Sequence, residues 1–188
     1  MTAFDDAADL FVSVVDEVPE SAWGQPGLGS WSVRELVAHG LRALALVEEY
    51  LLRPIEPVAD PKAYAAPDAV AARARQAVDA LGPDPKSAVH ATRDRVLGIV
   101  RSAGAGAVVG TPFGSLPLST YLPTRTAELT IHSLDLAAAI GVAADANDTL
   151  VRETLAVLVE MAARKGRGTE VIRALSGRGE LAPGFSVY

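Results

Sequence analysis

Apolar residues recur every three or four positions along most of this sequence, and that spacing is typical of amphipathic α-helices. Near the start of the chain it places Phe4, Phe11 and Val15 on one side of a helix. The clearest helix start lies at Ser32, whose side chain can cap the helix while Glu35 reaches back toward it, an arrangement called a capping box. The pattern predicts an all-α protein in which helices pack on one another.

Prolines and glycines divide the helical pattern into separate segments. The predicted helices cover residues 3–18, 32–52, 67–81, 85–103, 119–140 and 147–163, with a short helical turn over 169–175. We expect a loop over 20–29, a proline-bearing connection over 53–66, and an irregular stretch over 104–117 with a short strand at 107–109. Four or more long helices with one short irregular insert are typical of a helix bundle.

Composition excludes several classes of site and partner. The 188-residue chain has no cysteine, which excludes disulfides, thiolate zinc sites, iron–sulfur clusters and a cysteine nucleophile. A net charge of −6 without a basic stripe argues against nucleic acid as a partner. The acidic start lacks the basic region of a signal peptide, and no apolar run approaches the ~20 residues needed to cross a bilayer. We therefore expect a cytoplasmic protein with no membrane partner.

Glu128 and His132 are four residues apart on a predicted helix, so they lie on one face, one turn from each other. A carboxylate and an imidazole at this spacing can bind one metal ion, as paired ligands do in helical metal sites. A solvated ion pair is the alternative interpretation, because this spacing is common by chance.

His39 favours the metal interpretation, because it shares the apolar stripe of its helix with Leu36 and Val47 and should project inward. Two histidines and one glutamate from two helices form the ligand set of a catalytic zinc site with an open fourth position. A hydrogen-bonded polar group in the core remains the alternative.

Three further residues have weaker claims to a function. Asp135, one turn beyond His132, could accept a ring N–H of a ligating histidine, although a salt bridge with Arg125 is the alternative. Arg178 could meet an anionic substrate if the C-terminal tail folds over the bundle, although a solvated tail residue is the favoured interpretation. His90, followed by two arginines, is predicted to lie at the surface.

Two segments resemble a known family. Residues 29–39 read GSWSVRELVAH and are similar to the G-x-W-S-V-R-D/E-L-x-x-H opening of the mycothiol-dependent maleylpyruvate isomerase metal-binding domain. Residues 125–137 read RTAELTIHSLDLA and are similar to that family's R-x-x-E-L/V-x-x-H-x-x-D-L-A segment. The resemblance covers about residues 3–165 and implies a DinB-like four-helix bundle of the up-down-down-up type. It implies a metal-binding bundle over 1–166 with an additional C-terminal helix, and a tail over 167–188.

Carried over position by position, the resemblance makes His39, Glu128 and His132 the ligands of a divalent metal, zinc before nickel or iron. In the family's characterised isomerase, a metal-bound mycothiol thiolate adds to the double bond of the substrate, and rotation and elimination follow. A chain without cysteine suits this chemistry, because the sulfur arrives with mycothiol as a cosubstrate. The implied partners are a small-molecule thiol and an electrophilic substrate.

The residues after 166 are too few for the isomerase's second, sterol-carrier-like domain, which supplies a substrate-binding arginine. We therefore expect a mycothiol-dependent S-transferase or isomerase-like enzyme acting on another electrophile. A metal-dependent hydrolase and a non-enzymatic ligand-binding bundle are the alternatives. A homodimer is also compatible with such a bundle.

Overall fold

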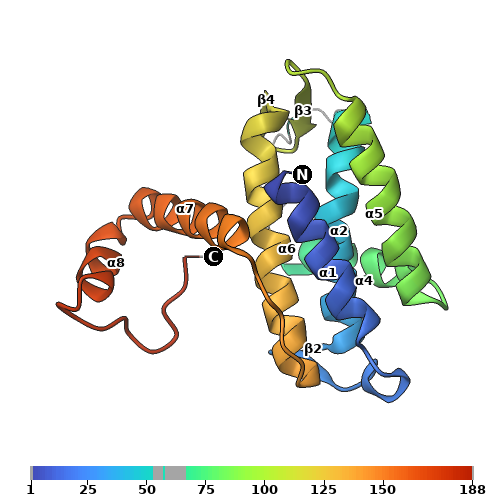
Figure 1. Ribbon diagram of the computed structural model, residues 1–188, viewed down its shortest axis with the longest axis horizontal. Helices are drawn as coiled ribbons and strands as arrows, with labels where there is room; N and C mark the ends of the chain where they lie inside the picture. The colour runs from blue at the N-terminus through green and yellow to red at the C-terminus, as the bar shows by residue number, and fades with distance from the viewer. Residues whose placement is uncertain (1, 53–56, 58–66, 188) are drawn as a thin grey trace.

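The computed structural model describes residues 2–52, 57 and 67–187. Four helices form the bundle: α1 (Ala3–Asp16), α2 (Val33–Leu52), α5 (Pro85–Ser102) and α6 (Leu118–Ile140). Helices α1 and α6 run in one direction and α2 and α5 in the other, which is the expected up-down-down-up order (Figure 1). Each of α1 and α2 contacts both α5 and α6, and α4 (Pro67–Leu81) packs on α2 and α5.

The helices begin where their capping residues predict. At the start of α2, the backbone N–H of Ser32 donates to Glu35 at 2.8 Å and the backbone N–H of Glu35 donates to Ser32 Oγ at 3.3 Å. Thr2 and Asp5 form a second capping box at the start of α1. At the other end of the bundle, α6 terminates at Gly141, whose φ of 75° is in the left-handed region that favours glycine.

One continuous core fills the space between the four helices. Its largest fully buried side chains include Phe4 and Phe11 of α1, Leu36 and Leu44 of α2, and Leu129 and Leu136 of α6. Gly40 of α2 leaves room for the ring of Phe11 of α1, because a Cβ on Gly40 would lie 2.4 Å from that ring. The core therefore fixes the axial rotation of α2 and α6, the two helices that carry the proposed ligands.

Two segments differ from the loops expected from the sequence. The irregular stretch before α6 is a β-hairpin in which β3 (Val108–Thr111) pairs antiparallel with β4 (Gly114–Pro117), longer than the single short strand predicted there. The loop after α1 contains a 3-10 turn, η1 (Glu20–Ala22), and β1 (Pro26–Leu28), which pairs with β2 (Trp31–Ser32). The connection expected over 53–66 lies outside the described residues, except for residue 57.

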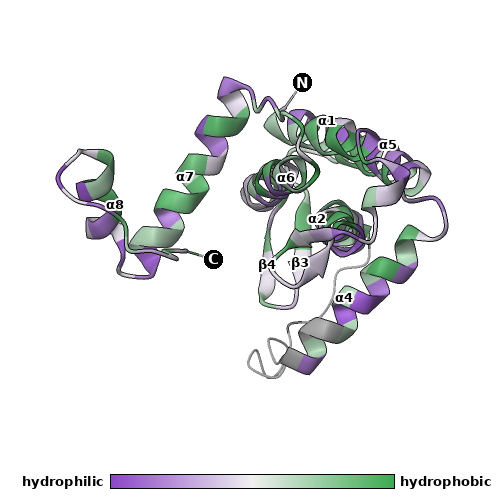
Figure 2. Ribbon diagram, turned by 90° about the horizontal axis from the view of Figure 1, so that it is seen from below, coloured by the Kyte–Doolittle hydropathy of each residue, from purple (hydrophilic) through white to green (hydrophobic). Residues whose placement is uncertain are grey.

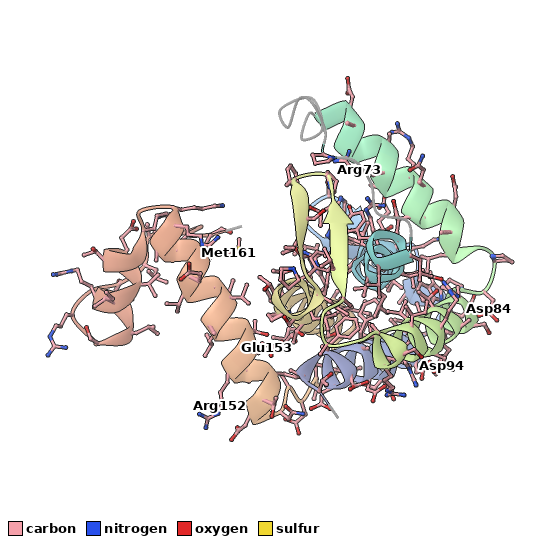
Figure 3. All side chains as sticks on the ribbon, turned by 90° about the horizontal axis from the view of Figure 1, so that it is seen from above. Arg73, Asp84, Asp94, Arg152, Glu153 and Met161 are labelled. Atoms are coloured by element: carbon pink, nitrogen blue, oxygen red, sulfur yellow. The ribbon has the colours of Figure 1, made fainter. Side chains whose placement is uncertain are left out.

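After α6 the chain leaves the bundle. Helix α7 (Asp148–Arg164) begins against α6 and α1 and then extends away from them, and α8 (Gly168–Leu175) lies at its far end (Figures 1 and 2). Figure 3 shows the same separation, with Arg152, Glu153 and Met161 labelled along α7. Residues 148–187 are called the arm below. Among the described residues, none of the helices is both long and apolar enough to span a membrane.

Candidate metal centre

The two helices that carry the proposed ligands are neighbours in the bundle. His39 lies in the second turn of α2, and Glu128 and His132 lie one turn apart near the middle of α6. Because α2 and α6 pack directly against each other, all three side chains reach the same place. Each offers one ligand atom, and these atoms all lie within 4.8 Å of one another.

The Glu128 carboxylate faces both imidazoles. Its Oε2 is 3.3 Å from Nε2 of His132 and 3.9 Å from Nε2 of His39. The two histidine rings meet edge to face, with centroids 4.7 Å apart. His132 and Glu128 are mostly buried, whereas 38% of the His39 side chain is exposed, so the group is open to solvent on the α2 side.

The surroundings set the charges of the three groups. Burial and the nearby His132 lower the pKa of His39 to about 4, although Glu128 acts in the opposite direction. Burial also opposes the charged form of His132, but the hydrogen bonds and charges of Glu128 and Asp135 outweigh it and raise the pKa of His132. Burial opposes ionisation of Glu128, yet His132 and Arg125 outweigh that effect and lower its pKa. At neutral pH His39 is therefore a neutral imidazole beside a carboxylate, and both are forms that bind metals.

Asp135 contacts His132 rather than an arginine. Its Oδ2 is 3.2 Å from Nδ1 of His132. A carboxylate only accepts hydrogen bonds, so this contact keeps a proton on Nδ1 and leaves Nε2 to face Glu128. A carboxylate in this position orients a histidine ring and makes it a better metal ligand.

Two residues to which the sequence analysis gave no role in the site contact two of the three candidate ligands. Trp31 of β2 lies over the His39 ring, with centroids 4.8 Å apart. Arg125 places Nη2 3.8 Å from Oε1 of Glu128, donates from Nε to Thr124, and lies over the ring of Tyr121. The one signal in the sequence was their position inside the two quoted segments, at residues 29–39 and 125–137.

The remaining candidates lie elsewhere. Helix α8 lies apart from the bundle (Figure 1). Arg178 follows α8 in the chain, and its Nη1 donates to the carbonyl of Ser176. His90 lies at the surface of α5 as expected, with Nε2 2.9 Å from the carboxylate of Asp16. The structure brings neither residue to the group on α2 and α6.

The donor set fits a divalent cation. Two imidazoles and one carboxylate converge, one imidazole is neutral, and Asp135 holds the other ring in place. Three protein ligands are the number found in catalytic zinc sites, where a fourth position is left to water or substrate.

Comparison with known proteins identifies relatives and a family. Two uncharacterised proteins of Mycobacterium tuberculosis, from strains CDC 1551 and H37Rv, are each 27% identical over 164 residues. The alignments cover 86% of this chain and 79% of each relative. No solved structure is similar enough to match. The family model for the mycothiol maleylpyruvate isomerase N-terminal domain matches residues 4–137, a range that contains His39, Glu128 and His132. The chain belongs to the family of the mycothiol maleylpyruvate isomerase N-terminal domain.

Proposed function

We propose that this protein is a metal-dependent enzyme that uses mycothiol as a cosubstrate in an S-transferase or isomerase-like reaction. The observation that carries the proposal is the convergence of His39, Glu128 and His132 from two helices of this family's bundle. Zinc is the first candidate for the ion, and nickel and iron are the alternatives, because imidazole and carboxylate ligands suit all three. Bound by these residues, the ion would lower the pKa of a thiol so that the thiolate form is present at neutral pH.

The chain's own residues prepare the site for such chemistry. His39 offers a neutral ring nitrogen, and Glu128 offers a negative charge that offsets part of the charge of a cation. Asp135 accepts from Nδ1 of His132 and so directs Nε2 toward the same point. The exposed side of His39 leaves an approach for small molecules.

The nucleophilic sulfur has to come from the cosubstrate, because the chain contains no cysteine. Its reaction partner is a small electrophile. The proposal places the protein in the cytoplasm, where low-molecular-weight thiols are kept reduced.

Metal content is the first test. Protein purified without a nickel column should contain about one divalent ion per chain, and His132→Ala should lose it. His90→Ala is the matched control and should retain the ion, because His90 lies apart from the group. Elemental analysis by mass spectrometry measures all three proteins. Metal-free native protein, with unchanged stability in His132→Ala, would leave only a non-enzymatic ligand-binding role.

Thiol dependence is the second test. Metal-loaded protein should convert electrophilic alkenes or epoxides only when mycothiol is present, and His132→Ala should not. An S-transfer consumes one mycothiol for each product formed, whereas an isomerisation releases the thiol again at the elimination step. Product formation that proceeds equally well without mycothiol would instead assign the site to a metal-dependent hydrolase, in which water is the nucleophile.

A further inference from the structure

The arm carries much of the exposed apolar surface of the molecule. Among the described residues, six of the eleven exposed large apolar side chains belong to it, although it contains about a fifth of the chain. They are Val151, Leu155, Val159, Ile172, Leu175 and Leu181. Such a concentration on one projecting element is typical of an interface.

The contacts within the arm do not explain this surface. Helix α7 is fixed at its start, where Leu150 is buried in the core and Asn147 Nδ2 donates to Asp6 at 3.0 Å. Beyond Thr154 its one buried residue is Ala162. Helix α8 packs on α7, but it has only eight residues and none of them is buried, so this contact covers little of its apolar surface.

The stripe on α7 is complementary to itself. Val151, Leu155 and Val159 are four residues apart and form one ridge along the helix. Two ridges of this kind interdigitate in the commonest helix packing in globular proteins, at a crossing angle of about −50°. If a two-fold axis runs perpendicular to α7 and passes Leu155, the two helices are antiparallel, and Val151 of one copy meets Val159 of the other. The same surface is then used on both copies, so the assembly stops at a dimer.

The charges of the chain favour the same arrangement. Residues 1–147 contain eleven Lys and Arg against eighteen Asp and Glu, a net charge of −7. Within the arm, residues 164–178 contain five basic residues against one acidic residue, a net charge of +4. A two-fold axis at Leu155 places the end of each α7 beside the start of the partner's α7, which is anchored on the partner's bundle. The basic segment 164–178 thereby approaches an acidic bundle.

We propose that the arm is a dimerisation element: α7 packs against α7 of a second copy about an axis at Leu155, and residues 164–178 lie toward the partner's bundle. An anionic membrane fits the same basic and apolar surface less well, because the bundle beside the arm carries a net charge of −7 and would be repelled.

Cross-linking tests the position of the axis. The chain has no cysteine, so Leu155→Cys introduces a single thiol that would face its own symmetry mate. Mild oxidation with copper phenanthroline should convert most of this variant to a disulfide-linked dimer. Ala163→Cys is the matched control on the same helix, because it lies about 12 Å along α7 from the axis and should remain largely monomeric on a non-reducing gel.

Sedimentation tests the dimer without cross-linking. As its concentration is raised to about 100 μM, the wild type should reach a sedimentation-derived mass of twice the 19.5 kDa of one chain. Added salt should weaken the association. Leu155→Glu should sediment as a monomer with an unchanged circular dichroism spectrum, because Leu155 is already half exposed within one chain.

Three outcomes would overturn the proposal. The first is a wild type that remains monomeric throughout this concentration range. The second is a dimer that survives Leu155→Glu while the Leu155→Cys variant fails to cross-link. The third is monomeric wild type that co-sediments with phosphatidylserine vesicles, which would assign the arm to a membrane surface.

Discussion

Asp135 contacts one histidine of the candidate metal centre. Its carboxylate accepts from Nδ1 of His132, so Nε2 is the nitrogen that faces Glu128 and His39. Without that acceptor the ring could rotate or take the other tautomer, and the donor set would be less well ordered.

Asp135→Asn should therefore weaken metal binding roughly 10- to 100-fold without unfolding the bundle. The amide is similar in size to the carboxylate but removes the negative charge beside the ring. Competition with a chromophoric chelator measures the affinity. Asp145→Asn, an exposed change in the loop after α6, should leave it unchanged. Equal affinities in all three proteins would show that Asp135 does not support the site.

Residue spacing predicted part of this site. Glu128 and His132 could be paired because residues four apart always share a helix face, and the stripe around His39 indicated its inward direction. The contacts of Trp31 and Arg125 could not be predicted in the same way. The first depends on where β2 lies relative to α2, and the second on the placement of Tyr121 and Thr124.

Helix caps determine where the elements of the bundle begin. At the start of α1, Asp5 accepts from the backbone and side chain of Thr2 and pairs with Arg101 of α5 at 2.8 Å. Burial raises the pKa of Asp5, but the bonds from Thr2 and the pairing with Arg101 outweigh it and bring the pKa below the ordinary value of 3.8.

Asp5→Asn should destabilise the protein by about 1 kcal/mol at pH 7. Because folding lowers the pKa of Asp5, the carboxylate stabilises the fold above pH ~4 and loses this contribution as the pH falls further. The difference from the wild type should thus shrink toward pH 3 in urea unfolding curves. Glu17→Gln, an exposed change at the end of α1, is the control and should show little effect. A difference that stays constant from pH 7 to pH 3 would contradict the prediction.

The sequence predicted long elements better than short ones. Periodicity, the positions of prolines and glycines, and one capping box located the bundle helices within a few residues, because each helix contains several turns of repeating pattern. Strands β3 and β4 have four residues each, and the glycine-rich sequence around them has almost no alternation. Their pairing depends on contacts with α2 and α6, which the local sequence does not contain.

At the scale of the whole molecule, the candidate metal centre joins two helices that are far apart in the chain. His39 and Glu128 belong to α2 and α6, with α4, α5 and the hairpin between them. A ligand that binds only the folded arrangement stabilises it by mass action.

Zinc added to metal-stripped protein should raise the Tm by about 5–10 °C at a hundredfold excess over its Kd. The rise should vanish in His39→Ala, which removes the ligand from α2, and persist in His90→Ala. Differential scanning calorimetry measures both. An equal Tm with and without metal in the wild type would show that no ion links the two helices.

The course of the arm could not be predicted from the sequence. The pattern over 147–163 predicts a helix, and α7 is present, but an apolar stripe does not say which surface covers it. In the structure α7 turns away from its own bundle, and its exposed stripe is explained by the proposed second copy.

Helix α6 contributes side chains both to the core and to the candidate metal centre, so insertions and deletions within it should be poorly tolerated. Leu129 and Leu136 fill the core from one side of α6, while Glu128 and His132 project from another side into the candidate metal centre. Inserting or deleting one residue between Arg125 and Asp135 would turn one part of the helix by about 100° relative to the other. The change would disrupt the packing of the core and the arrangement of the candidate metal ligands at the same time. Length variation among functional members of the family should therefore concentrate in the hairpin before α6 and in the segment after it.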